Sequence, residues 1–242
     1  MYAIKAENLT KKYKDITAVD CLNLEVKEGE LFALLGVNGA GKTTAIKMLT
    51  GIAKPHSGDA FIFGKSIITD YRAVKEVIGV SPQETAVAPN LTAEENLMFM
   101  CGVQGLSKSD SKKKTDELVN AFALKEILNK KAGKLSGGWQ RRLSIALALA
   151  SEPKLLFLDE PTLGLDVLAR SDLWDLIRNL KGKTTIILTT HYMEEAESLS
   201  DRIGIMKDGK LLKTGTAEEF KALTGKEKLE EAFIAVVKGD FK

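Results

Sequence analysis

LFALLGVNGAGKTTAIKML, residues 31–49, joins a strand pattern to a helix pattern through a glycine-rich loop. Residues 31–35 are all apolar, which is typical of a parallel strand that is covered on both faces. Residues 43–49 then favour a helix. A loop in this setting can bind phosphate, because its N–H groups and the positive end of the helix dipole point toward the anion. The stretch therefore predicts a phosphate-binding loop in an α/β protein.

The loop fits the pattern G-x-x-x-x-G-K-[ST] at every fixed position. Its glycines allow the backbone turns that direct N–H groups inward. Lys42 is expected to reach the β- and γ-phosphates of ATP, and the hydroxyl of Thr43 is expected to bind Mg²⁺. The predicted ATP-binding residues of this segment are Gly36, Val37, Asn38, Gly39, Ala40, Gly41, Lys42, Thr43 and Thr44.

Two carboxylates follow a second buried strand pattern. Residues 155–158 are apolar, and Asp159 and Glu160 come directly after them. Parallel sheets bind ligands at the carboxyl ends of their strands, so both side chains are expected near the phosphates. We predict that Asp159 binds Mg²⁺, directly or through water, and that Glu160 orients and polarises the attacking water. An Asp-Glu pair alone is a weak signal, and here the phosphate-binding loop supports it.

Gln83 and His191 are two further candidates. The Gln83 amide could contact Mg²⁺ or the attacking water, although glutamine is also common in ordinary loops. His191 follows the strand pattern of residues 185–189, so its imidazole is expected at the same edge of the sheet and could bond to the γ-phosphate. The predicted catalytic residues are Glu160, His191 and Gln83, and the predicted metal-binding residues are Thr43, Gln83 and Asp159.

The segment LSGGWQ, residues 135–140, predicts a second helix N-terminus that can bind an anion. Ser136 is a good N-cap residue, and Gly137 and Gly138 leave the N–H groups of the first turn uncovered. One nucleotide has no evident need for two such termini from one chain. The second terminus is therefore expected to contact a nucleotide that another copy holds.

The remaining patterns divide the chain into a β-rich beginning, a helical middle and an α/β end. Thr92 and Glu95 form a capping box, and helix formers dominate from there to about residue 150. Strand patterns then return. A second capping box at Thr216 and Glu219 opens a helical tail, in which the part after Leu223 is the one candidate for a loosely attached appendix.

Composition narrows the function classes only a little. The formal net charge of +2 is too small to argue for nucleic acid as a partner. Cys21 and Cys101 have no Cys-x-x-Cys spacing, which favours free thiols over a metal site or a disulfide framework. Charged residues such as Lys5 and Glu7 interrupt the first apolar stretch, so no signal peptide is expected there. No apolar run approaches the roughly 18 residues that span a bilayer. If the protein works at a membrane, another polypeptide is expected to cross it.

One ordered set of motifs resembles the nucleotide-binding subunit of an ABC transporter, over Tyr13 to about Thr214. The set comprises the phosphate-binding loop, Gln83, residues 135–138, residues 155–160, Leu165-Asp166 and His191. In that family two subunits pair head to tail, and the signature segment of one subunit closes the ATP of the other. That role would fall to Ser136, Gly137, Gly138 and Trp139.

The resemblance implies two further roles. Tyr13 matches the aromatic residue that stacks on adenine, and the alternative is a surface tyrosine of a sheet. Asp166 matches a residue at the dimer interface, where it can also cap a helix. Trp139 stands where the family most often has glutamine, at a variable position, and Val37 replaces a frequent proline at a free position of the loop.

The expected fold is an α/β P-loop NTPase core with a mainly parallel sheet, an N-terminal antiparallel β subdomain and an inserted α-helical subdomain. Residues 1–242 would form a single ABC-type ATPase domain, with the helical subdomain at about 90–150 and the tail at about 216–242. The resemblance implies hydrolysis of ATP to ADP and phosphate, with Mg²⁺ as cofactor.

The expected partners are a transmembrane permease and a second ATPase subunit, either identical or different, and no nucleic acid. The subunit would lie at the cytoplasmic face of the membrane as a peripheral protein. Residues 139–142, residues 189–197 and the short tail look more like the exporter branch, which moves drugs, lipids and polysaccharides. The alternative is a soluble ABC ATPase that acts on ribosomes or nucleic acid, but the chain lacks a second cassette, a long coiled-coil insertion and a strong basic stripe.

Two other readings fit the motifs less well. Glu160 and His191 argue against a regulatory module that binds nucleotide without hydrolysing it. A P-loop metabolic kinase would leave residues 135–138 without an account.

Overall fold

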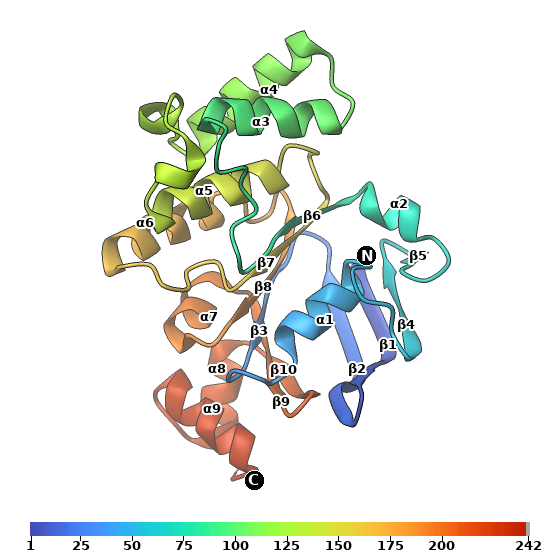
Figure 1. Cartoon of the computed structure of the whole chain (residues 1–242). Coiled ribbons are helices and arrows are strands. Elements are labelled where there is room, and N and C mark those ends of the chain that lie inside the picture. The colour runs from blue at the N-terminus through green and yellow to red at the C-terminus, as the bar shows by residue number, and fades with distance from the viewer. Residues whose placement is uncertain (241–242) are drawn as a thin grey trace. The chain divides into compact units, whose positions relative to one another are not determined.

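The computed structural model describes residues 1–240 and shows an α/β protein (Figure 1). Its residues group into two compact units. The first unit combines Met1–Lys75 with the chain from Lys181 onward, and the second unit is Glu76–Leu180. The chain therefore leaves the first unit after Lys75 and returns to it at Lys181.

One sheet of the first unit is antiparallel throughout, with strand order β2-β1-β4-β5. The strands are β1 Tyr2–Tyr13, β2 Ile16–Lys27, β4 Ser57–Ile62 and β5 Lys65–Ser66. In β2 the side chains of Leu22, Leu24 and Val26 are at most 2% exposed, while the residues between them are exposed. The alternation places one face of the strand in the core. The expected N-terminal antiparallel β structure is confirmed.

The central strand of the unit's other sheet is β3, Leu31–Leu35. It runs parallel to β8, Thr185–Thr190, on one side and to β9, Arg202–Lys207, on the other. β10, Lys210–Gly215, pairs with β9 in the antiparallel direction. All residues of β3 are buried, as its continuous apolar pattern predicted. The phosphate-binding motif thus begins at the end of a strand that is held on both edges.

The helices of the first unit include two that form the helical tail expected from the sequence. The unit's helices are α1 Lys42–Leu49, α2 Tyr71–Lys75, α7 Met193–Leu199, α8 Ala217–Thr224 and α9 Leu229–Lys238. In α9, Leu229, Ala232 and Phe233 are at most 4% exposed. Lys207 also donates its Nζ to the carbonyl oxygen of Val237 at 3.0 Å. A loose attachment of this segment is therefore wrong for the described part, and residues 241–242 of the predicted tail lie outside it.

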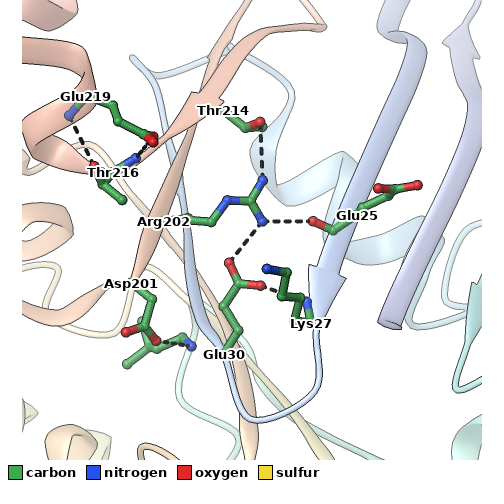
Figure 2. A network of polar contacts seen from close by, with 9 residues as sticks. Glu25, Lys27, Glu30, Asp201, Arg202, Thr214, Thr216 and Glu219 are labelled. Carbon is green, nitrogen blue, oxygen red and sulfur yellow. Dashed lines mark hydrogen bonds and ion pairs between the residues drawn. The ribbon is translucent and has the colours of Figure 1, made fainter. Parts of the chain in front are cut away.

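Arg202 fixes the start of β3 to neighbouring strands of the first unit (Figure 2). Its guanidinium donates to the Glu30 carboxylate at 3.1 Å, to the Glu25 carbonyl oxygen at 3.3 Å and to the Thr214 hydroxyl at 3.3 Å. The other Glu30 carboxylate oxygen accepts the N–H of Lys27 at 2.7 Å. Glu30 is buried, so these charge-assisted bonds hold the turn before β3 firmly. The turn sets where β3 begins, and hence where the loop at its far end lies.

The second unit holds two parallel strands and the helices of the middle of the chain. β6, Ile78–Ser81, pairs with β7, Leu155–Asp159, in parallel. The α-helices of this unit are α3 Ala93–Val103, α4 Lys108–Ala121, α5 Gly137–Ala148 and α6 Val167–Arg178. The Thr92 hydroxyl accepts the N–H of Glu95 at 3.2 Å, and the Glu95 carboxylate accepts the N–H of Thr92 at 2.7 Å. This reciprocal pair starts α3 where the sequence predicted a capping box.

Along residues 1–240, no helix combines the length and the apolar character that crossing a membrane requires.

Candidate nucleotide-binding site

The loop that follows β3 closes around the side chain of Lys42. Gly39 has φ +83° and Gly41 has φ +102°, both in the left-handed region that favours glycine. Lys42 begins α1 and is 5% exposed, and its Nζ donates to the carbonyl oxygens of Gly36 at 2.8 Å and Val37 at 3.3 Å. An ammonium group and a helix N-terminus therefore meet in one loop, which suits the charge of a polyphosphate.

Two strands lie so close to this loop that two of its positions have no room for a side chain. A Cβ on Gly36 would lie 2.5 Å from the carbonyl oxygen of Met206 in β9. A Cβ on Gly41 would lie 2.4 Å from the carbonyl oxygen of Ala18 in β2. Any side chain at either position would push the loop away from its supporting strand. The glycines of the motif thus serve packing as well as loop conformation.

The turn between β9 and β10 also bonds to the loop. Gly209 donates its N–H to the carbonyl oxygen of Ala40 at 3.0 Å, and its own carbonyl oxygen accepts the N–H of Asp20 at 2.9 Å. This one residue therefore connects the phosphate-binding loop to β2. In the sequence, Asp208-Gly209 is visible only as a hairpin signal. Its contact with a loop about 170 positions earlier has no local pattern that could reveal it.

Tyr13 and His191 belong to the same unit as the loop. Tyr13 ends β1 opposite Ile16, close to the part of β2 that touches Gly41, and it is 47% exposed. His191 follows β8, and the residue before it, Thr190, accepts the N–H of Gly36 at 3.3 Å. Backbone contacts therefore bring the segments that carry both side chains to the loop.

In the second unit, β7 ends in the two carboxylates that the sequence singled out. Asp159 and Glu160 are 4% and 7% exposed. Glu160 has φ +47°, which is uncommon for a residue with a side chain and costs about 1–2 kcal/mol. Its carbonyl oxygen accepts the N–H of Leu163 at 3.2 Å, which closes a turn. The same left-handed backbone occurs at seven other described non-glycine residues, and at Glu160 it turns the chain as it leaves β7.

Gln83 has an exposed side chain on a backbone that is fixed to α5. The guanidinium of Arg141, which is 4% exposed, donates to the carbonyl oxygen of Pro82 at 2.6 Å and also to that of Gln83. The hydroxyls of Ser81 and Ser144 share a hydrogen bond of 3.0 Å. The sequence analysis missed Arg141 as a supporting residue, since an arginine beside another arginine gives no sign of burial.

The first turn of α5 has open space beside Gly137 and a close neighbour beside Gly138. Ser136 has the extended backbone of an N-cap, but its hydroxyl makes no capping hydrogen bond, which corrects the capping expected from the sequence. A Cβ on Gly137 would meet only the Leu165 side chain, at 3.9 Å, whereas a Cβ on Gly138 would lie 3.2 Å from the Ala169 Cβ. The first N–H groups of a helix have no partner within the helix. This terminus can therefore accept an anionic group from outside.

Asp166 and Trp139 complete the predicted set. The Asp166 carboxylate caps α6 by accepting a backbone N–H three residues on, at 2.9 Å. The next two side chains, Val167 and Leu168, are 75% and 78% exposed. The Arg142 guanidinium lies 4.8 Å from the centroid of the Trp139 ring. Two large apolar side chains are therefore exposed to solvent next to the cap of α6.

The predicted residues thus fall into two groups, one in each unit. The first unit holds Tyr13, residues 36–44 and His191, and the second unit holds Gln83, residues 136–139, Asp159, Glu160 and Asp166. The first group can bind a nucleotide through its phosphates. The second group supplies buried carboxylates and an open helix N-terminus, which are the elements of water activation and anion binding.

Comparisons with known proteins agree with this chemistry. A family model described as "ABC transporter" matches residues 19–163. The chain is 40% identical over 240 residues to "Probable multidrug ABC transporter ATP-binding protein YbhF" of Escherichia coli (strain K12), which covers 97% of the chain and 41% of that protein. It is 40% identical over 224 residues to "Daunorubicin/doxorubicin resistance ATP-binding protein DrrA" of Streptomyces peucetius, covering 92% of the chain and 68% of that protein.

A solved structure has the same fold. It is described as "Dimeric structure of a post-hydrolysis state of the ATP-binding cassette MJ0796 bound to ADP and Pi", with a TM-score of 0.80 and 29% identity over 88% of this chain and 98% of that one. The chain spans less than half of the length of YbhF, but more than two thirds of DrrA. The matched family segment contains the phosphate-binding loop, the open helix N-terminus and both buried carboxylates. The chain therefore belongs to the ABC transporter family, as an ATP-binding subunit with P-loop ATPase activity.

Proposed function

We propose that this chain is the ATP-driven subunit of an exporter, in which a separate permease crosses the membrane. One observation carries the proposal: the chain offers two distinct surfaces for a nucleotide. The loop around Lys42 is one, and the first turn of α5, left open in front of Gly137, is the other. The descriptions of YbhF and DrrA as multidrug and drug-resistance proteins support export as the direction.

Two ATPase subunits would pair head to tail, as a homodimer or with a related chain. The first turn of α5 in one subunit would then bind the γ-phosphate of the ATP held by the loop of the other. The exposed side chains of Val167 and Leu168, next to Asp166, would be covered in the pair. The dimeric ADP-bound cassette of MJ0796 supports such an assembly.

The chemistry divides among named groups. Tyr13 stacks on adenine, and Lys42 and the N–H groups of the loop hold the phosphates. Glu160 accepts a proton from water as the water oxygen attacks the γ-phosphorus, and the bond from that phosphorus to ADP breaks. His191 donates a hydrogen bond to a γ-phosphate oxygen. ADP and phosphate then leave.

The residues proposed to hold Mg²⁺ fit that ion. The Thr43 hydroxyl, the Asp159 carboxylate and the Gln83 amide all offer oxygen, which is the donor that Mg²⁺ prefers. Mg²⁺ usually takes few protein ligands together with phosphate oxygens, so three such residues suffice. When bound, the ion would neutralise charge on the phosphates.

The permease would dock on the second unit. On α3 the side chains of Phe99 and Val103 are 61% and 62% exposed. A cavity of about 180 Å³ in the same unit is lined by Ala86, Met100 and Gln104, among others. Exposed apolar side chains on a helix that also contributes Met100 to the lining of a cavity suit an inserted helix of a membrane protein. Residues 1–242 would act as one ABC-type ATPase domain with a helical subdomain at about 90–150 and a tail at about 216–242, peripheral at the cytoplasmic face of the membrane.

Glu160→Gln tests the ATPase mechanism and the pairing together. Loss of the proton acceptor should lower turnover by about 10²–10⁴-fold, while ATP binding is retained. ATP should then accumulate a dimer, measured by light scattering after gel filtration. Glu126→Gln, an exposed glutamate of the same unit, is the matched control. An ATP-loaded Glu160→Gln protein that stays monomeric would contradict the pairing.

Purification from native membranes in mild detergent tests the transporter assignment. A polytopic protein should come with the chain and be identified by mass spectrometry. Phe99→Glu should lose this partner and keep the basal ATPase rate, while Ile234→Glu, an exposed position on α9, should keep both. Recovery with ribosomes or nucleic acid in place of a membrane protein would favour the soluble ABC ATPase instead.

A further inference from the structure

We propose that Lys11 is a positioning residue of the nucleotide site, which holds the ring of Tyr13 from one side and leaves the other face for adenine. The inference rests on the proposed stacking of adenine on Tyr13. It assigns a role to a charged side chain that no motif of the site includes.

The ammonium group of Lys11 is fixed between two segments of the first unit. Its Nζ lies over the Tyr13 ring, 5.2 Å from the ring centroid. The same Nζ donates a hydrogen bond to the carbonyl oxygen of Lys54 at 2.6 Å. A cation within about 6 Å of an aromatic face is attracted by the negative charge of that face. The ring therefore has a charged group on one side that is itself held in place.

The loop that carries Lys54 is in turn fastened to β1. His56 donates its N–H to the carbonyl oxygen of Thr10 at 2.8 Å. Its Nδ1 accepts the N–H of Lys12 at 3.3 Å. These two bonds flank Lys11 in β1, so the carbonyl oxygen of Lys54 is a fixed anchor for the ammonium group.

Tyr13 needs such a support because of where it lies. It is the last residue of β1, before a two-residue turn, and its side chain is 47% exposed. A ring that rotates freely loses conformational entropy when a base stacks on it, which weakens binding. Lys11 restrains the ring before ATP arrives and covers one face, so that the base stacks on the other.

Lys11→Met tests the role, with Lys12→Met as the matched control. Methionine keeps the apolar stem and removes the charge, and Lys12 has the same formal charge one residue further on. We expect Lys11→Met to weaken binding of ATP by about two- to fivefold, the range of an exposed cation–π contact. Binding of magnesium tripolyphosphate, which has no base, should stay unchanged. Lys12→Met should match the parent for both ligands.

A double-mutant cycle with Tyr13→Ala separates this inference from the stacking on which it rests. Tyr13→Ala should weaken ATP binding by about 5- to 150-fold, the range of base–aromatic stacking. In that background Lys11→Met should have no further effect. If Tyr13→Ala binds ATP like the parent, the stacking itself is wrong. If Tyr13→Ala binds ATP weakly, the stacking stands and three results would overturn the role of Lys11 alone. Lys11→Met could bind ATP like the parent, could weaken the binding of tripolyphosphate as much as that of ATP, or could add its full effect to that of Tyr13→Ala.

Discussion

Arg141→Met removes the guanidinium that fixes the segment of Gln83 to α5. The substitution keeps the apolar stem but deletes the donors to the carbonyl oxygens of Pro82 and Gln83. A hydrogen bond from a charged donor contributes about 1.5–3 kcal/mol. Two such bonds contribute about 3–6 kcal/mol, and water cannot replace them because Arg141 is 4% exposed. Burial of the methionine offsets part of this loss, so we expect the free energy of unfolding to fall by about 3 kcal/mol.

Calorimetry of the nucleotide-free protein measures the effect. In a chain of this size, 1 kcal/mol shifts the melting temperature by about 2–4 °C, so Arg141→Met should melt about 6–12 °C below the parent. Lys5→Met is the control, because its pair with Glu7 is exposed to solvent. Exposed ion pairs contribute at most about 1 kcal/mol. A melting temperature of Arg141→Met within about 4 °C of the parent, the largest shift expected for the control, would refute the anchoring.

Three further predictions concern the loop, its support and one helix cap. Lys42→Ala should lose nucleotide affinity and turnover together, as measured by titration with a fluorescent ATP analogue and by phosphate release. Gly209→Ala should weaken ATP binding, because its Cβ would lie 3.0 Å from the Ala18 carbonyl oxygen beside the loop. Gly64→Ala, with φ +78° and open space around its Cβ, should alter stability alone. Equal ATP affinities of the two variants would contradict the role of Gly209 in holding the phosphate-binding loop. The N–H of Thr92 lowers the pKa of the Glu95 carboxyl, so its stabilisation is present above the ordinary carboxyl pKa and lost as pH falls through the lowered value. Melting curves between about pH 5 and pH 3 should therefore lose less stability on acidification in Glu95→Gln than in the parent, and identical curves would contradict this.

The strand before the phosphate-binding loop and the starts of two helices could be predicted because their signals lie within a few neighbouring residues. Residues 31–35 are apolar on both faces, and the structure places them as the central strand β3. The capping boxes at Thr92 and Thr216 also give their signal within four residues, and both start helices as expected. Such signals are local, because the residues that produce them touch one another along the chain.

What the sequence did not reveal depends on residues far apart in the chain. The carbonyl oxygens of Met206 and Ala18 lie close to glycines of the phosphate-binding loop, and no pattern in the sequence around Met206 or Ala18 indicates that contact. Arg141 is polar by type and buried by context. The left-handed backbone of Glu160 is likewise unexpected, since glutamate has no preference for that conformation. Support around a site is therefore harder to predict than the residues that touch the ligand.

At Glu160 the backbone conformation that lowers stability and the side chain proposed for ATP hydrolysis belong to the same residue. Glycine adopts a φ near +47° without steric conflict, so Glu160→Gly would relieve about 1–2 kcal/mol of conformational cost. The same change would delete the carboxylate proposed to activate water. Glycine would also lose about 0.5–1 kcal/mol more backbone entropy on folding, together with the contacts of a side chain that is 7% exposed. Heat tolerance and ATP turnover therefore make separate demands on this one position, and a change that improves one need not improve the other.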